Sequence, residues 1–137
     1  MSISRGVLAL FAAAAFVPLL TADDASVARG KYLVDEVARC GMCHTPLTEA
    51  GQPDASKYLK GGNLNLAPIQ PVERWHKTAP DITSTSRLWQ RWGDAGLVKF
   101  FETATGPTGN KADLPMPAYK LSHEDAQAIV DYLKSVK

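Results

Sequence analysis

Apolar or small residues recur every three or four positions between about residue 26 and residue 39, which predicts an amphipathic helix there. These positions are Val27, Gly30, Val34, Val37 and Ala38. Ser26 is expected to be the N-cap, because its hydroxyl can accept a hydrogen bond from a first-turn amide. Gly30 lies inside the predicted helix, where glycine costs about 1 kcal/mol relative to alanine. We therefore expect another helix to approach this glycine closely.

A second apolar stripe predicts a C-terminal helix that begins after Ser122. The Ser122 hydroxyl can cap the amide of Asp125, and the acidic side chains of Glu124 and Asp125 are favourable in the positive first turn. The stripe consists of Ala126, Ile129, Val130, Leu133 and Val136. Because such a face is buried in folded proteins, the helix must pack against another element.

The middle of the chain has a different pattern. Residues 45–87 are rich in Gly, Pro and Asn and show little strand-like alternation. A shorter helix is predicted over about residues 94–102, with Leu97, Val98 and Phe101 on one side. The expected fold class is therefore all-α, with helices at both ends and long loops between them.

The first 22 residues have the layout of a secretory signal peptide. Arg5 precedes an apolar run over residues 7–20, and the small residues Thr21 and Ala22 follow. The run is shorter than the roughly 20 apolar residues of a membrane-spanning helix and contains Pro18, so an uncleaved anchor is the weaker alternative. We expect residues 1–22 to be a signal peptide cleaved after Ala22, export to the periplasm, and one domain over residues 23–137.

The charge balance indicates no polyanionic partner. The chain has 15 basic and 14 acidic residues, and cleavage after residue 22 would remove one basic residue, Arg5. The mature chain would then have a formal charge of zero and no long basic run, so binding of nucleic acid is not expected. No membrane span is expected after signal cleavage.

The most specific motif in the chain is Cys40-Gly41-Met42-Cys43-His44, which is typical of covalent haem c attachment. One helical turn places both thiols on the same side of the backbone, where they can bond the two haem vinyl groups, and His44 then reaches the iron. The alternatives are a thioredoxin-like dithiol, a structural disulfide and a zinc site. The first lacks its flanking elements, the second would close a very short loop, and the third lacks a second cysteine pair.

Met116 is expected to be the second axial ligand of the iron. It lies between Pro115 and Pro117, which bar a regular helix and restrict the local backbone. Soft thioether sulfur opposite imidazole raises the reduction potential by favouring ferrous iron. His76, in a polar context, and His123, in the first turn of the last helix, are more typical of surface histidines. A methionine that only packs within a loop is the remaining alternative.

These features together resemble the class I c-type cytochromes, and the resemblance covers essentially the whole mature sequence. It is closest to bacterial single-haem proteins and to the cytochrome subunits of periplasmic dehydrogenases. The shared blocks read Cys43 to Pro46, Ala79 to Thr83 and Leu114 to Pro117, with Asp81 and Leu114 in place of the more usual Asn and Pro. The resemblance implies a cytochrome c-like fold in which the N- and C-terminal helices cross and long loops wrap one covalently bound haem.

The same resemblance implies contacts within the fold. Gly30 would meet Tyr132 or Leu133 where the first and last helices cross. A backbone carbonyl in the region Gly61–Leu64 would accept a hydrogen bond from His44, which orients the imidazole and tunes its basicity.

The resemblance also suggests groups that bind the haem propionates. In the family these are often an indole N–H and hydroxyls, so the candidates here are Trp92 or Trp89, together with Thr83. Plain packing is an equally good interpretation of the tryptophans.

The leading functional hypothesis is a periplasmic electron-transfer protein, not an enzyme, that passes single electrons between redox partners such as a dehydrogenase, an oxidase or a reductase. A monomeric free carrier is expected, and a fixed cytochrome c subunit of a periplasmic dehydrogenase is the alternative. The sequence shows no obvious apolar extension for permanent docking, which favours the free carrier. A haem enzyme or gas sensor would need a displaceable sixth ligand, and Met116 argues against it.

Overall fold

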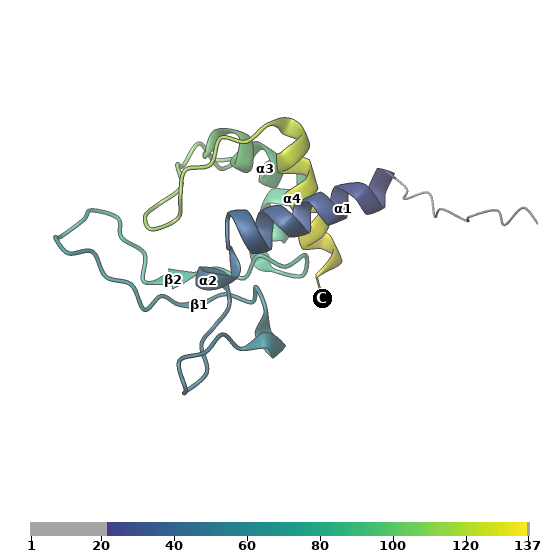
Figure 1. Ribbon diagram of the computed structural model, residues 1–137. Helices are drawn as coiled ribbons and strands as arrows, with labels where there is room; N and C mark the ends of the chain where they lie inside the picture. Colours follow the sequence, from purple (N-terminus) through teal and green to yellow (C-terminus); the bar gives the residue numbers. More distant parts are fainter. Residues whose placement is uncertain (1–21, 137) are drawn as a thin grey trace, which may run out of the picture.

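The computed structural model describes residues 22–136, which form a mostly helical fold (Figure 1). The elements in chain order are α1 (Ala22–Tyr32), η1 (Leu33–Val37), α2 (Gly41–His44), η2 (Ala55–Lys57), β1 (Gly62–Asn63), β2 (Thr78–Ala79), α3 (Arg87–Thr103) and α4 (His123–Ser135). The predicted signal peptide, residues 1–22, lies outside the described residues except for its last position. Within residues 22–136, no helix combines the length and apolar character that a membrane span requires.

The helices at the two ends of the chain cross in direct contact, as expected (Figure 1). Gly30 is buried at the crossing, where an added Cβ would lie 1.8 Å from the Ala128 carbonyl oxygen and 2.8 Å from Tyr132 Cβ. The backbones can approach this closely only because residue 30 has no side chain. The crossing confirms the close approach predicted at Gly30.

Helix α1 begins four residues before the predicted start, so the prediction of Ser26 as the N-cap is wrong. Ser26 lies inside the helix, and its hydroxyl donates a hydrogen bond of 2.6 Å to Asp131 Oδ2 on α4. Arg29 makes a second polar link to α4, with Nε 2.9 Å from Asp125 Oδ1. These two contacts lie on either side of the crossing, so Ser26 and Arg29 help to align α1 with α4.

The last part of the first predicted helix is a wider, π-helical turn, η1. The amide of Ala38 donates to the Leu33 carbonyl at 2.8 Å, and the amide of Cys40 donates to the Val34 carbonyl at 2.9 Å. Arg39 then adopts a left-handed conformation with φ 51°. This change of direction leads the chain into the cysteine motif.

Helix α3 is longer than the predicted segment 94–102 and contains a break. The Ser86 hydroxyl accepts a hydrogen bond from the Trp89 amide at 3.1 Å and caps an additional turn before the predicted start. Gly93 interrupts the helix with φ 62° and ψ 179°, a conformation open mainly to glycine. The prediction therefore found only the second half of α3, because the apolar periodicity restarts after Gly93.

Helix α4 agrees with its prediction. The Ser122 hydroxyl accepts a hydrogen bond from the Asp125 amide at 3.2 Å, and the predicted stripe faces the core. The core lies between α1, η1, α3 and α4, and its largest fully buried side chains are Leu59, Ile129, Leu133, Val34 and Val130.

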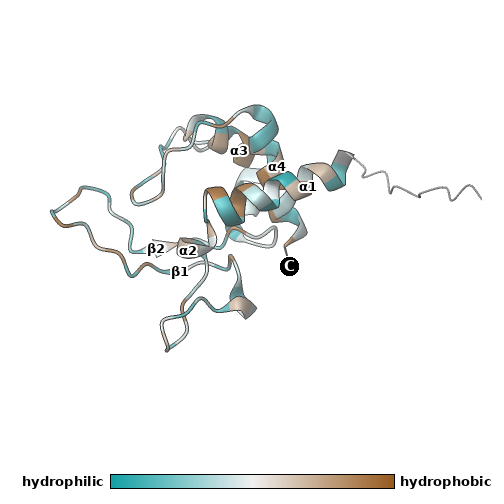
Figure 2. Ribbon diagram, in the orientation of Figure 1, coloured by the Kyte–Doolittle hydropathy of each residue, from teal (hydrophilic) through white to brown (hydrophobic). Residues whose placement is uncertain are grey.

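The long middle segment contains two very short strands that were not predicted. β1 and β2 are antiparallel and pair Gly62 with Ala79 and Asn63 with Thr78. Residues 64–77 between them form a loop that extends away from the helices (Figure 1). This loop exposes 53% of Leu66, 103% of Ile69 and 38% of Val72, and Figure 2 shows its apolar positions in brown. The expectation that the chain has no exposed apolar extension is therefore wrong.

We predict that Gly30→Ala destabilises the protein by about 1–3 kcal/mol, the usual cost of forcing an extra carbon into a packed contact. In an unobstructed helix the same substitution would stabilise by about 1 kcal/mol. Chemical denaturation measures the difference. Ala28→Gly, at an exposed position of the same helix, is the control and should lose only the propensity difference of about 1 kcal/mol. A Gly30→Ala variant more stable than the wild type would contradict the observed crossing.

Candidate functional site

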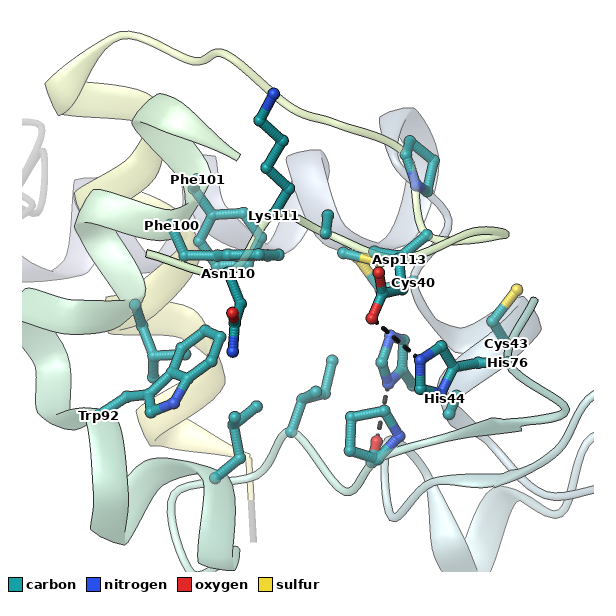
Figure 3. Close-up of a pocket in the computed structure, with 18 of the residues that line it drawn as sticks. Cys40, Cys43, His44, His76, Trp92, Phe100, Phe101, Asn110, Lys111 and Asp113 are labelled. Carbon is teal, nitrogen blue, oxygen red and sulfur yellow. Dashed lines mark hydrogen bonds and ion pairs between the residues drawn. The ribbon is translucent and has the colours of Figure 1, made fainter. Parts of the chain in front are cut away.

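A cavity of about 590 Å³ lies between the cysteine motif, α3 and the loop after α3. Its volume falls within the range of about 300–1,000 Å³ that is usual for ligand and cofactor sites. In Figure 3, Trp92, Phe100 and Phe101 of α3 lie on one side of this space, and Cys40 and His44 lie on the other. Its walls are mainly apolar, so it suits a large apolar group.

Cys40 and Cys43 both line the cavity, and both are free thiols. The amide of Cys43 donates to the Cys40 carbonyl at 3.2 Å, so one tight turn relates the two cysteines. Burial raises the pKa of the Cys40 thiol to about 11. Among the described residues, no group of three or more His, Cys, Asp or Glu side chains could hold a metal ion. Both thiols stand at one wall of the cavity.

The imidazole of His44 is buried and held in one orientation. Its Nδ1 lies 2.8 Å from the Pro80 carbonyl oxygen (Figure 3, dashed line). Because a carbonyl can only accept, Nδ1 carries the proton and Nε2 keeps its lone pair. Burial lowers the pKa of His44, although the Pro80 carbonyl and the charge of Asp81 oppose this shift. A neutral, oriented imidazole is the form that binds iron.

The acceptor for His44 differs from the prediction, which placed it in Gly61–Leu64. That region does contact His44, but through the amide of Gly61, which donates to the His44 carbonyl at 2.7 Å. The side chain instead bonds to Pro80, 36 residues later in the chain, immediately after β2. The antiparallel pairing of β1 and β2 brings both segments to the same histidine.

Met116 lines the same cavity as His44 and the two cysteines. It is partly buried against the core, and its amide donates to the Asp113 carbonyl at 3.0 Å. Pro115 and Pro117 also line the cavity. The fold therefore brings together the histidine and the methionine that the sequence singled out, although they are far apart in the chain.

The two tryptophans proposed as propionate partners have different positions. Trp92 lines the cavity and packs against Phe100, with ring centroids 5.3 Å apart. Trp89 is buried outside the cavity lining, and its Nε1 donates to Asp94 Oδ1 at 2.9 Å. Of the pair, only Trp92 has a position suited to contact a bound cofactor.

Thr83 is fully buried but does not line the cavity. Its hydroxyl donates to Asp81 Oδ1 at 2.7 Å, and Lys60 Nζ lies 3.2 Å from the same hydroxyl. The structure therefore does not bring Thr83 to the cavity with the other candidate residues. Its hydrogen bonds shape the turn that carries Pro80 and Asp81.

Of the α3 residues that line the cavity, only Trp92 was proposed from the sequence as a cofactor contact. On the first part of α3, Leu88, Arg91 and Trp92 all line the cavity. On the second part, Leu97, Phe100 and Phe101 do so. Each set has the spacing i, i+3, i+4 of one helix face. This signal was present in the sequence, but the break at Gly93 divides it between two short segments.

These residues fit a covalently attached haem. The walls are mainly apolar, two free thiols lie one turn apart, and a neutral imidazole is fixed beside them. Thioether sulfur from Met116 belongs to the same lining, and imidazole with thioether is a known axial ligand pair for haem iron.

Sequence comparisons agree with this geometry. The family model for cytochrome c matches residues 27–137. The chain is 35% identical to the cytochrome c subunit of alcohol dehydrogenase (quinone) from Gluconobacter oxydans (strain 621H), over 90% of this chain and 28% of the relative. It is 34% identical to the fructose dehydrogenase cytochrome subunit of Gluconobacter japonicus, over 79% of this chain and 21% of the relative.

A diheme cytochrome c-type protein of Cereibacter sphaeroides is also 34% identical, over 79% of this chain and 34% of the relative. The chain thus spans between about a fifth and a third of the length of these three relatives. The family match, by contrast, covers nearly all the described residues and includes every residue of the cavity lining. The chain therefore belongs to the cytochrome c family and carries its electron-transfer domain, with a cysteine pair for covalent haem c.

Proposed function

We propose that this protein is an exported, periplasmic electron carrier with one haem c, linked through Cys40 and Cys43 and ligated by His44 and Met116. The observation that carries the proposal is that His44 and Met116 line a single cavity together with both free thiols. The hydrogen bond from His44 to Pro80 supports the assignment of the histidine as the proximal ligand.

The chain's own residues define what the site can do. A bound haem would supply the one-electron chemistry of ferric and ferrous iron. The Pro80 carbonyl holds His44 in the tautomer whose Nε2 can donate electrons to a metal. The Met116 thioether is a soft ligand that favours the ferrous form, and the apolar walls exclude water, which also favours the form with less charge.

Electron transfer to a partner requires only a brief contact near the cavity opening. Redox encounters bury a small area, below roughly 1,200 Å² in total. The cavity lining includes one lysine, Lys111. This supports Lys111 as a rim charge that steers a partner toward the opening.

A second candidate function is a fixed subunit of a dehydrogenase, and the exposed loop favours it. Leu66, Ile69 and Val72 project from residues 64–77, while Leu64 and Thr78 at the base of the loop line the cavity. Exposed aliphatic side chains on a projecting loop are typical of a protein interface. Relatives of this chain are named as cytochrome subunits of alcohol, fructose and gluconate dehydrogenases. A dehydrogenase chain covering this loop would sit next to the haem site.

Met116→Ala should convert the oxidised protein from a low-spin to a high-spin ferric spectrum and lower its reduction potential, because the iron loses its sulfur ligand. Absorption and magnetic resonance spectra, with a redox titration, measure both effects. Met42→Ala is the matched control, since Met42 is 65% exposed and outside the cavity lining. An unchanged Met116→Ala spectrum would refute the methionine ligand.

Periplasmic extracts should contain a protein whose mass equals residues 23–137 plus one haem, because the first 22 residues have a signal-peptide layout. Mass spectrometry of the intact protein decides this directly. A mature protein that retains residues 1–22 and stays with the membrane would instead support the uncleaved anchor.

If the chain is a fixed subunit, the double variant Leu66→Ser with Ile69→Ser should abolish its co-purification with a dehydrogenase chain, because it removes apolar contact area. The co-purifying chain is identified by its mass and by dye reduction with alcohol, fructose or gluconate. Val37→Ser, at another exposed aliphatic position (57% exposed), is the control and should retain the complex. Wild-type protein that purifies without a dehydrogenase chain would favour the free carrier.

A further inference from the structure

One short segment contacts both the proximal histidine and the loop that carries Met116. We call residues 74–80 the strap. At its C-terminal end, the Pro80 carbonyl accepts the hydrogen bond from His44 Nδ1. In its middle, β2 pairs with β1. At its N-terminal end, Arg74 and His76 contact Asp113, three residues before Met116.

The contacts to Asp113 use both oxygens of its carboxylate. Arg74 Nη2 lies 2.6 Å from Oδ1, and His76 Nε2 lies 3.0 Å from Oδ2 (Figure 3, dashed line for His76). The backbone adds a third link, because the His76 amide donates to the Leu114 carbonyl at 2.8 Å. Side chains and backbone thus join the strap to the start of the methionine loop.

The geometry also connects Asp113 directly to Met116. The Asp113 carbonyl accepts the hydrogen bond from the Met116 amide at 3.0 Å, so both residues belong to one turn. The ends of the surrounding loop are held to the opposite side of the cavity, where Ala112 donates to the Ala104 carbonyl and Leu121 donates to the Phe101 carbonyl, each at 3.0 Å. The contacts of Asp113 therefore hold the turn on the side where the strap reaches His44.

The partial exposure of these three side chains places their contacts at the opening of the cavity. The side chains of Arg74 and His76 are 61% and 57% exposed, and that of Asp113 is 27% exposed. His76 and Asp113 nevertheless belong to the cavity lining. Exposed ion pairs are individually weak, but here the Arg74 guanidinium and the His76 imidazole share one carboxylate, and a backbone hydrogen bond reinforces both contacts.

We propose that Arg74, His76 and Asp113 form a positioning cluster that holds the Met116 turn against the strap, so that the methionine sulfur resists displacement by an external ligand. The inference rests on the proposed ligation by Met116. The strap then couples the two axial ligands mechanically, since its two ends act on His44 and on Met116. The cluster residues are not iron ligands themselves.

Asp113→Asn in the haem-loaded, ferric protein tests this cluster by titration with imidazole, which must displace the methionine to bind. We expect imidazole to bind about two- to fivefold more tightly than to the wild type, the range expected from losing exposed ion pairs. Asp125→Asn is the matched control, because it removes another exposed arginine–aspartate pair, Arg29–Asp125, that lies outside the cavity lining. It should leave the imidazole affinity unchanged.

The possible results distinguish a specific effect of the cluster from a general loss of stability and from an error in the assignment of Met116. Equal imidazole affinity in Asp113→Asn and wild type overturns the proposal, and so does an equal gain in Asp125→Asn, which would indicate general loosening. Arg74→Gln added to Asp113→Asn should give no further gain, because both variants break the same contact. The assignment of Met116 is tested separately. If Met116 is not an iron ligand, Met116→Ala will bind imidazole no more tightly than the wild type.

Discussion

The close contact between Gly30 and the Ala128 carbonyl sets the geometry from which the rest of the molecule follows. It lets α1 and α4 cross with their backbones in contact, and the side chains on either side of the crossing form the core. The position of α1 then determines where η1 ends and where Cys40 lies. A bulkier residue at position 30 would push apart the two helices on which the cysteine motif depends.

A polar network supports the cysteine motif from the side away from the cavity. The carboxylate of Asp35, on η1, accepts hydrogen bonds from Lys31, from Tyr58 and, at 3.3 Å, from Tyr132 of α4. Burial disfavours the charge of Asp35, but the hydrogen bonds outweigh it, and its pKa is lowered. Burial, followed by the hydrogen bond to Asp35, raises the pKa of Tyr58. The network joins α1, η1 and α4 to Tyr58, the residue that follows η2.

Regular helices and irregular segments contribute different groups to the cavity. Regular helices supply the apolar wall, because α3 presents Trp92, Phe100 and Phe101 from fixed positions. Irregular segments supply backbone carbonyls, at Pro80 and Asp113, that accept hydrogen bonds from the His44 side chain and the Met116 amide. Loops suit this role because their carbonyl groups are not consumed by helical hydrogen bonds. A long central segment without regular structure is thus a functional part of this fold.

The sequence by itself determined the chemistry and the helical frame. Cys40, Cys43 and His44 lie within five residues, so the haem-attachment motif can be recognised without knowledge of the fold. The Ser122 cap and the stripe of α4 are likewise local, and a costly glycine at position 30 indicated the helix crossing. Covalent haem attachment and the cytochrome c fold could be predicted for this reason.

Only the tertiary structure decided which distant groups meet. The hydrogen-bond acceptor for His44 is the Pro80 carbonyl, and not a carbonyl of the nearer segment Gly61–Leu64. The cavity lining includes Trp92 but neither Trp89 nor Thr83. These choices depend on the pairing of β1 with β2 and on the break in α3, each set by a few backbone contacts that leave no periodic pattern in the sequence. Local spacing specifies residues on one turn, whereas contacts between remote segments are fixed only when the whole chain packs.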